Sequence, residues 1–299
     1  MKTAISIGNF DAVHQGHIAI VRAARACVGS GGQVEIWTFD PPPVSVLDPS
    51  VQLHRLTTFQ ERTTLLLEAG ADGVRKIIPT SELLAQSPDA FIERVVEESH
   101  PDFIVEGKGF QFGKNRAGNA DTLHALGDQF GFSLVEVEPV LVGLSDGEHR
   151  ASSTLVRSLL LEGRVNDAAR MLGRECMVTG IVTKGDQRGR EMGVPTANLS
   201  QVGTMLPEDG IYAGSAEVGG KKYTAAISIG TNPTFGEHER VLEAHLISFE
   251  GDLEHYGWPL TVTISHWIRE QVTFDTMETL KEQIEADIQV AINRIESTQ

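Results

Sequence analysis

Cysteine is nearly absent from this chain of 299 residues, which contains only Cys27 and Cys176. The two lie far apart in the sequence and in unrelated surroundings. A disulfide framework needs several paired cysteines, and a zinc site needs Cys or His ligands at short, regular spacings. The sequence therefore supports neither a disulfide-stapled fold nor a zinc site.

Basic residues are also scarce, because 25 Lys and Arg face 41 Asp and Glu, giving a formal net charge of −16. Surfaces that bind nucleic acid or acidic membranes need clustered Lys and Arg. We therefore expect neither nucleic acid nor a membrane among the partners. Small anions such as nucleotides stay compatible with this charge, since glycine-loop amides, helix N-termini, Mg²⁺ and a few local cations can hold them.

Long apolar runs are missing, although hydrophobic residues make up 40% of the chain and suffice for a packed core. Met1 and Lys2 are followed by a short strand-like run and not by a secretory hydrophobic region. We expect a soluble, cytoplasmic protein, long enough for two domains. The P-loop pattern G-x-x-x-x-G-K-[ST] is absent too, so a kinase activity would have to use another phosphate-binding loop.

The first half of the chain alternates between strand and helix patterns. A buried strand, Thr3–Gly8, precedes an Ala-rich helix over Ile18–Cys27. Thr57 or Thr58 is a candidate cap for a helix over 58–69, with Glu61 in the capping-box position. Further strands are predicted at 34–39, 74–78, 103–105 and 133–137, and further helices at 88–99, 120–130 and 151–161. This alternation predicts a doubly wound parallel sheet with its ligand at the carboxyl ends of the strands.

His14 and His17 flank Gly16 where the first strand passes through Gly8 into the first helix. Two imidazoles at a helix N-terminus can donate hydrogen bonds to phosphate oxygens as charge shifts in a group transfer. Ordinary surface histidines are the alternative, and for an isolated H-x-x-H we would favour it. Placed directly after a strand and a glycine, H-x-G-H indicates a nucleotidyltransferase site.

Ser152, Ser153 and Thr154 open a later helix, and Arg157 follows one turn in. Three hydroxyls at a helix start are good caps, which is one sufficient explanation. The other is that Arg157 supplies a cation for a triphosphate beside the N-terminal amides. The segment resembles the S-S-T-x-x-R element that accompanies H-x-G-H in the adenylyltransferase superfamily.

From about Glu175 the pattern changes to short strands separated by glycine or asparagine turns, which is typical of an antiparallel barrel. Strands are predicted at 176–183, 210–218, 223–229, 241–249 and 260–268. A closing helix over Met277–Ile295 places its apolar residues on one stripe, and its Glu and Lys residues are expected to face solvent.

The run Gly189–Leu199 contains Pro195, Thr196 and Asn198. Neutral side-chain oxygens two residues apart suit a hard cation that phosphate oxygens already bridge. A polar turn between two strands is the alternative, and we would prefer it for an isolated P-T-x-N. The longer run resembles the G-R-x-x-G-x-P-T-A-N signature of riboflavin kinases, which is long and specific.

Nearly the whole chain resembles the bacterial bifunctional riboflavin kinase/FAD synthetases. The similar segments are 8–17, 56–61, 110–118, 152–157, 189–199, 230–235, 241–246 and 268–274. The resemblance implies a Rossmann-like FMN adenylyltransferase domain over 1–173, whose end, Leu159–Gly173, is a helical connection. It implies a β-barrel riboflavin kinase domain with a terminal helix over 174–299.

This resemblance implies that riboflavin and ATP give FMN, and that FMN and ATP give FAD and pyrophosphate, with Mg²⁺ as the cofactor. In the adenylyltransferase half, His14 and His17 would steady the α-phosphate and the leaving pyrophosphate. Arg157 would contact the β/γ region. The other nucleotide-binding residues implied there are Gly8, Phe10, Asp11, Gly16, Ser152, Ser153 and Thr154.

In the kinase half, the resemblance makes Glu243 the general base for the ribityl 5′-hydroxyl, and Thr196 and Asn198 the Mg²⁺ ligands. A loop from Gly185 to Gly193 would cover the ATP phosphates. Its nucleotide-binding residues would be Gly185, Arg190, Gly193 and Pro195. Strand alternation puts Glu243 and His245 on one face, but it leaves open whether that face is a site or only meets solvent.

Three residues of the first half depart from the family pattern: Ala12 and Gly109 replace a usual Gly and a usual Asp or Asn, and Pro42 replaces a usual His. An alternative is therefore an active riboflavin kinase whose first half is impaired, altered in its acceptor, or a non-catalytic nucleotide- or flavin-binding module. The intact H-x-G-H and S-S-T-x-x-R motifs favour an active first half. The sequence does not indicate an oligomeric state.

Overall fold

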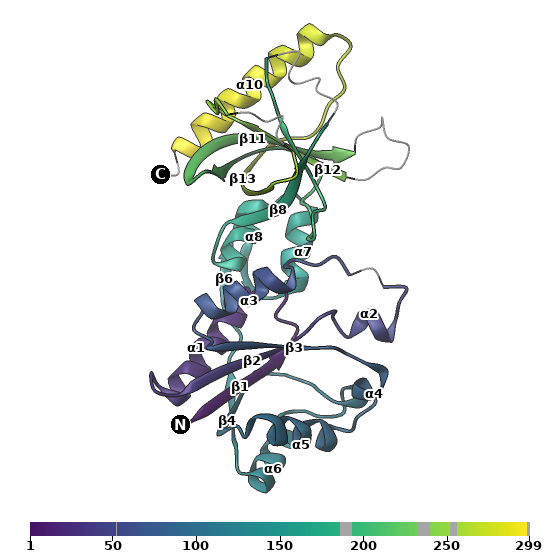
Figure 1. Ribbon diagram of the computed structural model, residues 1–299, viewed down its shortest axis with the longest axis vertical. Helices are drawn as coiled ribbons and strands as arrows, with labels where there is room; N and C mark the ends of the chain where they lie inside the picture. The colour runs from purple at the N-terminus through teal and green to yellow at the C-terminus, as the bar shows by residue number, and fades with distance from the viewer. Residues whose placement is uncertain (52, 186–192, 232–239, 252–255, 298–299) are drawn as a thin grey trace. The chain divides into compact units, whose positions relative to one another are not determined.

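The computed structural model describes residues 1–299 except 52, 186–192, 232–239, 252–255 and 298–299. The chain forms two compact units, Met1–Ser153 and Thr154–Gln299 (Figure 1). This division falls within the S-S-T-x-x-R segment, whereas the expected domain boundary lies at residue 173. The functional boundary between the domains stays a prediction.

The first unit is built on a sheet in the order β3-β2-β1-β4-β5 whose paired strands all run parallel. This confirms the predicted doubly wound parallel sheet. Its strands are β1 (Thr3–Gly8), β2 (Gln33–Phe39), β3 (Gly73–Ile77), β4 (Phe103–Gly107) and β5 (Ser133–Val137). Its helices are α1 (Gln15–Val28), α2 (Val44–Leu47), α3 (Phe59–Glu68), α4 (Ser81–Leu84), α5 (Pro88–Ser99) and α6 (Ala120–Phe130), with the 3₁₀ turn η1 at Lys114–Arg116.

Helices cover both faces of this sheet, because β1 is apolar on both sides (Figure 1). Ile5 and Ile7 pack in a core with residues of α5 and α6. Ala4, one residue before Ile5, points to the other face and packs in the opposite core with residues of α1 and α3. The two cores hold the central strand rigidly, and its carboxyl end carries the H-x-G-H loop.

Local capping sets where the helices begin. Thr58 is the N-cap of α3 and forms a reciprocal capping box with Glu61, as expected. Ser87 caps α5, which has Pro88 in its first turn, and Asn119 caps α6. Thr58 fixes the start of α3 and therefore also fixes the direction in which the side chain of Arg62 leaves the helix, one turn later.

Two features of the first unit differ from expectation. Consecutive prolines favour an extended chain, but Pro43 has helical angles and precedes α2, while the Asp40–Pro41 peptide is cis. Pro43 is followed by Val44, so the steric exclusion of helical angles before a proline does not apply to it. The hairpin of β6 (Leu141–Leu144) and β7 (Gly147–Arg150) was not predicted, since both strands are short and mostly exposed.

The helix α7 (Ser153–Leu161) starts at the last residue of the first unit, and the rest of it lies in the second unit. It is followed by α8 (Val165–Leu172) and by an antiparallel closed barrel in the order β10-β11-β12-β9-β8-β13. The predicted barrel is thus confirmed. Its strands are β8 (Cys176–Thr183), β9 (Ala197–Ser200), β10 (Gly210–Val218), β11 (Lys221–Thr231), β12 (Arg240–Leu246) and β13 (Pro259–Arg269). The terminal helix α10 (Met277–Glu296) lies along the outside of this barrel (Figure 1).

One charged residue of α10 is buried and not solvated. Asp287 accepts hydrogen bonds from Arg269 of β13, with its Oδ2 2.6 Å from Arg269 Nη2. Gln283 donates to the same carboxylate. The contact joins α10 to the barrel beside the apolar residues Ala291 and Ile295. The stripe pattern alone could not distinguish this aspartate from the exposed acidic residues of the helix.

Candidate active sites

The first candidate site lies where β1 ends and α1 begins. β1 pairs with β2 on one side and β4 on the other, so the strand order changes direction at this point. Ligands of doubly wound sheets bind at the carboxyl ends of strands beside such a change. His14 is the N-cap residue of α1. The structure therefore places the H-x-G-H motif at the position that the fold favours for a nucleotide.

His14 and His17 stack, with ring centroids 3.7 Å apart and planes 19° apart. The backbone N–H of His17 donates to Nδ1 of His14 over 3.4 Å, so a neutral His14 carries its proton on Nε2. A Cβ atom on Gly16 would lie only 3.0 Å from Cε1 of His14. Glycine is needed in H-x-G-H because the imidazole lies against the first turn of the helix.

The loop between β1 and α1 has an unusual backbone. Phe10, Ala12 and Val13 have φ values of 46°, 77° and 45°, in the left-handed region that non-glycine residues rarely occupy. All three side chains are buried, and the Phe10 ring lies 5.0 Å from the His17 ring. Ala12 is the position where the family usually has glycine, so the left-handed backbone there explains that preference.

Asp11 lies inside this loop and is only 2% exposed. Its Oδ1 accepts hydrogen bonds from the N–H of Thr57 at 3.0 Å and the hydroxyl of Thr57 at 3.0 Å. The N–H groups of Ala12 and Leu56 also donate to this carboxylate. The carboxylate thus supports the shape of the loop, and its expected contact with a nucleotide stays a prediction.

The S-S-T-x-x-R segment begins beside this loop. The Ser153 hydroxyl donates to the carbonyl oxygen of Asp11 over 2.7 Å. Ala151 approaches Gly16, since a Cβ built on that glycine would lie 3.5 Å from the Ala151 Cβ. Thr154 and Arg157 lie on α7 within the second compact unit. Their contacts with a triphosphate, and that of the half-buried Ser152, stay predictions.

A buried carboxyl group lies next to the first site. Glu106, near the end of β4, is 3% exposed, and its Oε1 accepts a hydrogen bond from the N–H of Ile7 over 2.6 Å. Burial raises the pKa of Glu106 well above its usual value, although the Ile7 hydrogen bond acts in the opposite direction. Glu106 was not predicted from the sequence, because one Glu at the end of a strand carries no distinguishing pattern.

The second candidate site lies on the barrel. Glu243 of β12 is paired directly with Asn198 of β9. Directly opposed residues of antiparallel strands project their side chains to the same face, with Cβ atoms about 4.5–5.5 Å apart. The neighbouring pair, Leu242 and Leu199, is fully buried and fills the barrel interior. Glu243 and Asn198 therefore share the outer face of the barrel, and whether that face is a site stays a prediction.

This outer face carries a row of polar residues across neighbouring strands. Thr183 of β8 is paired with Asn198, and Ser228 of β11 is paired with Glu243. The Thr183 hydroxyl donates to the Asn198 carbonyl oxygen over 3.4 Å. Gln271 donates to the Ser228 hydroxyl over 3.3 Å. A row of this kind offers acceptors and donors along one line, as a polar substrate or a hydrated cation requires.

Two contacts hold the chain that leads into Asn198. Nδ1 of His245 lies 2.8 Å from the carbonyl oxygen of Pro195, directly before Thr196. Gly185 lies so close to Asn198 that a Cβ on it would be 2.4 Å from the Asn198 Nδ2. Gly193 has a φ of +82°, which explains glycine at that position. Gly185, the first residue of the 185–193 loop, thus packs closely against Asn198, the candidate magnesium ligand.

Arg190 lies outside the described residues, as does most of the Gly185–Gly193 loop. Within the part of the chain that the structure describes, no group of three His, Cys, Asp or Glu residues is arranged to hold a metal ion. Asn198, opposite Glu243, and Thr196, directly before β9, both carry neutral side-chain oxygens. That donor set fits Mg²⁺ only together with phosphate oxygens and water, which is the usual arrangement for this ion with a nucleotide.

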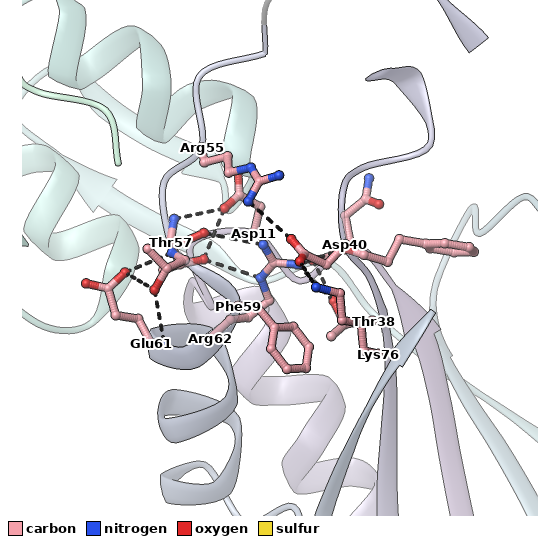
Figure 2. A network of polar contacts seen from close by, with 12 residues as sticks. Asp11, Thr38, Asp40, Arg55, Thr57, Phe59, Glu61, Arg62 and Lys76 are labelled. Carbon is pink, nitrogen blue, oxygen red and sulfur yellow. Dashed lines mark hydrogen bonds and ion pairs between the residues drawn. The ribbon is translucent and has the colours of Figure 1, made fainter. Parts of the chain in front are cut away.

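The residues that support the first site were not predicted as site residues. Arg62, Thr57 and Thr38 are buried around the H-x-G-H loop (Figure 2). Thr57 lies within the family-like segment 56–61, so the resemblance contained a signal for it. Arg62 and Thr38 lie outside that segment and carry no motif. Their part in the site follows from tertiary contacts alone.

A parallel α/β unit and an antiparallel barrel, each with a candidate site, are the architecture of a two-part nucleotide-dependent transferase. The family described as FAD synthetase matches residues 1–155, and the family described as riboflavin kinase matches residues 172–295. A bifunctional riboflavin kinase/FMN adenylyltransferase of Pseudomonas fluorescens is 33% identical over 96% of this chain and 91% of its own length. The protein of that name from Escherichia coli K12 is 31% identical over 95% and 90%.

The chain belongs to the bifunctional riboflavin kinase/FMN adenylyltransferase family. A crystal structure described as a macrolide-efflux protein from Streptococcus pneumoniae has the same fold, with a TM-score of 0.88 and 28% identity over 98% of this chain and 94% of that one. The word efflux describes that protein and is not applied to the present chain. In the present chain, no helix among the described residues has the length and apolar character needed to cross a membrane.

Proposed function

We propose that this protein phosphorylates riboflavin with ATP to FMN and then transfers AMP from a second ATP to FMN, giving FAD and pyrophosphate. The observation that carries the proposal is that each half of the chain has its own family match and its own candidate site. His14 and His17 lie at the end of β1, and Glu243 and Asn198 lie opposite one another on the barrel.

In the riboflavin kinase step, the ribityl 5′-hydroxyl attacks the γ-phosphorus of ATP, and the bond from that phosphorus to the β,γ-bridging oxygen breaks. Glu243 accepts the hydroxyl proton as the general base, and ADP leaves. Thr196 and Asn198 hold Mg²⁺, which neutralises charge on the ATP phosphates when bound. His245 holds the Pro195 carbonyl and so fixes the chain directly before Thr196.

In the adenylyltransferase step, a phosphate oxygen of FMN attacks the α-phosphorus of ATP, and the bond to pyrophosphate breaks. No covalent enzyme intermediate is needed, because both reactants carry their own reacting groups. The Nε2–H of His14 and the imidazole of His17 donate to the α-phosphate and the leaving pyrophosphate. Arg157 contacts the β/γ region. Gly8, Phe10, Gly16 and the 152–154 hydroxyls shape the nucleotide pocket in this proposal.

A cytoplasmic location is part of the proposal, because both reactions consume ATP.

Of the three family departures, Gly109 is the easiest to accommodate. Its φ of +87° is a conformation that Gly, Asn and Asp tolerate better than other residues, and the space around its missing Cβ is open. The usual Asn or Asp and the present Gly therefore suit the same backbone.

The test is to incubate the purified protein with riboflavin, ATP and Mg²⁺ and to follow the flavins by chromatography. FMN should rise first and then convert to FAD, with pyrophosphate released in the second step. FMN that accumulates without FAD, even when FMN is supplied directly, would leave a kinase with an altered first half. A folded protein that forms no FMN would contradict the kinase assignment.

A further inference from the structure

The loop of residues 9–13, directly before the H-x-G-H motif, has a strained backbone conformation that its own residues do not favour. Phe10, Ala12 and Val13 are non-glycine residues with left-handed backbones, and Val13 is β-branched. Backbones of this kind persist only where surrounding contacts over-determine them, and they concentrate at functional sites. The loop ends at His14, which caps α1 and stacks on His17. The groups that hold the loop therefore also decide where the two imidazoles lie.

The central group among these contacts is Arg62 of α3, whose side chain is fully buried. Its Nη1 donates to the carbonyl oxygen of Asn9 at 3.0 Å, to the Thr38 hydroxyl at 3.1 Å and to the carbonyl oxygen of Phe39 at 2.9 Å (Figure 2). Asn9 belongs to the loop after β1, and Phe39 ends β2. One guanidinium thus ties together the carboxyl ends of two adjacent strands, on the side of the sheet where the ligand is expected.

Thr57 connects Arg62 to the interior of the 9–13 loop through hydrogen bonds. Its hydroxyl accepts hydrogen bonds from Nε of Arg62 at 3.4 Å and from the N–H of Ala12 at 3.2 Å, and it donates to Oδ1 of Asp11 at 3.0 Å. A single hydroxyl therefore connects the guanidinium to the two central residues of the strained loop. Thr38 closes the arrangement by donating to the Asn9 carbonyl oxygen at 2.9 Å.

The charge of Arg62 is balanced by two carboxylates. Burial lowers the pKa of Arg62 from its usual value, and the negative charges of Asp11 and Asp40 act in the opposite direction. Asp40 in turn forms ion pairs with Arg55 and Lys76, which are partly exposed (Figure 2). Burying a charged group costs folding free energy even when it is paired. We therefore expect a role of Arg62 besides stability.

We propose that Arg62, acting through Thr57, is a positioning residue for adenylyl transfer: it holds the strained 9–13 loop so that His14 and His17 meet the α-phosphate. Arg62 is not a catalytic residue in this proposal, because it is buried and acts through the loop. The proposal rests on the proposed FMN adenylyltransferase function, and it goes beyond that function by naming a residue outside every motif of the site.

The test compares Arg62→Met, which removes every donor, with Arg62→Lys, which keeps the charge and part of the hydrogen bonding. We expect kcat for FAD formation from FMN to fall about 100-fold in Arg62→Met and about 10-fold in Arg62→Lys, because small displacements of reacting groups have effects of this size. KM for ATP should change much less than kcat. Riboflavin kinase activity of the same molecules should be unchanged, which reports that the second unit is folded.

Arg25 provides a matched control in the same unit. It donates to the carbonyl oxygens of Gly32 and Gly70 and pairs with Asp72, at the amino ends of β2 and β3, which is the opposite edge of the sheet. Arg25→Met should lower the melting temperature without changing kcat for adenylyl transfer. If Arg62→Met and Arg25→Met gave the same kcat at equal folded fraction, Arg62 would be only structural, and the proposal would be overturned.

Amide hydrogen exchange over residues 9–14 gives a readout that does not depend on activity. Exchange of this segment should speed up in Arg62→Met and stay unchanged in Arg25→Met; unchanged exchange in both would overturn the proposal. Wild-type protein that forms no FAD from FMN would instead contradict the proposed function, while the exchange result would still test the restraint. If Arg62→Met does not fold, the double variant Thr57→Val/Arg62→Lys is compared with its two single variants. Because Arg62 acts through Thr57, the loss of kcat in the double variant should be smaller than the sum of the two single losses, expressed as free energies. Fully additive losses would overturn the proposal.

Discussion

Glu243 on β12 and Asn198 on β9 are directly opposed residues on the outer face of the barrel. A proposed general base and a proposed magnesium ligand, 45 residues apart in the sequence, are thus brought to neighbouring positions. The alcohol to be phosphorylated and the ATP phosphates must meet at such a point for in-line transfer. The opposed pair makes the kinase half open to a direct test.

Glu243→Gln removes the proton acceptor and keeps the size of the side chain. The rate of FMN formation from riboflavin should fall by about 10²–10⁴-fold, the usual contribution of a general base. FMN adenylylation, measured by pyrophosphate release, should be unchanged. Equal loss of both activities in a folded variant would contradict separate sites.

His17→Ala removes one of the two stacked imidazoles. FAD formation from FMN should fall by about 10²–10³-fold, as for the loss of one donor to a transition-state oxyanion. FMN formation from riboflavin should keep its wild-type rate, because the kinase residues lie in the second unit. A variant with wild-type FAD formation would remove His17 from the proposed mechanism.

Gly185→Ala adds one methyl group where only 2.4 Å separates the built Cβ from Nδ2 of Asn198. Asn198 or the loop must shift, and we expect riboflavin kinase kcat to fall by about 10–100-fold. Gly143→Ala is the control, because no atom lies within 4 Å of a Cβ at that position. Both variants should keep adenylyl transfer, measured as FAD formation from FMN.

Ala12→Gly restores the residue that the family usually has. It relieves a left-handed backbone worth about 1–2 kcal/mol, but loses a buried methyl worth about 0.8 kcal/mol and adds a chain-entropy cost of about 0.5–1 kcal/mol. Because these effects nearly cancel, the free energy of unfolding in urea should change by less than about 1 kcal/mol. Ala12→Val should be clearly destabilised, since a β-branched residue is poorly tolerated at a φ of 77°.

Glu106→Gln tests the buried carboxyl group beside Ile7. Burial raises the pKa of Glu106, so the folded protein keeps this proton at pH values where the unfolded chain has lost it. The wild type should therefore lose stability as the pH rises above about 4.3, until the native carboxyl itself ionises. The stability of Glu106→Gln relative to wild type should rise over that window, measured by urea unfolding at several pH values. A difference that is constant with pH would contradict this assignment.

Much of the fold could be predicted because its signals are local. α5 and α6 were predicted with the limits that the structure has, since Ser87 and Asn119 cap them and Pro88 marks a first turn. The short strand β9 was missed, although it contains Asn198, because four residues at a polar motif give no period-two signal. Local pattern also found H-x-G-H, whose glycine the imidazole of His14 requires.

The sequence by itself determined the two kinds of unit, the sequence positions of the candidate residues and the family resemblance, because periodicity, caps and motifs depend on neighbours along the chain. Only the tertiary structure decided that Glu243 faces outward beside Asn198, since alternation is the same for either face until the barrel closes. Only the tertiary structure made Arg62 a buried clamp. Its partners Asn9 and Thr38 are distant in the sequence, and burial arises from such long-range packing.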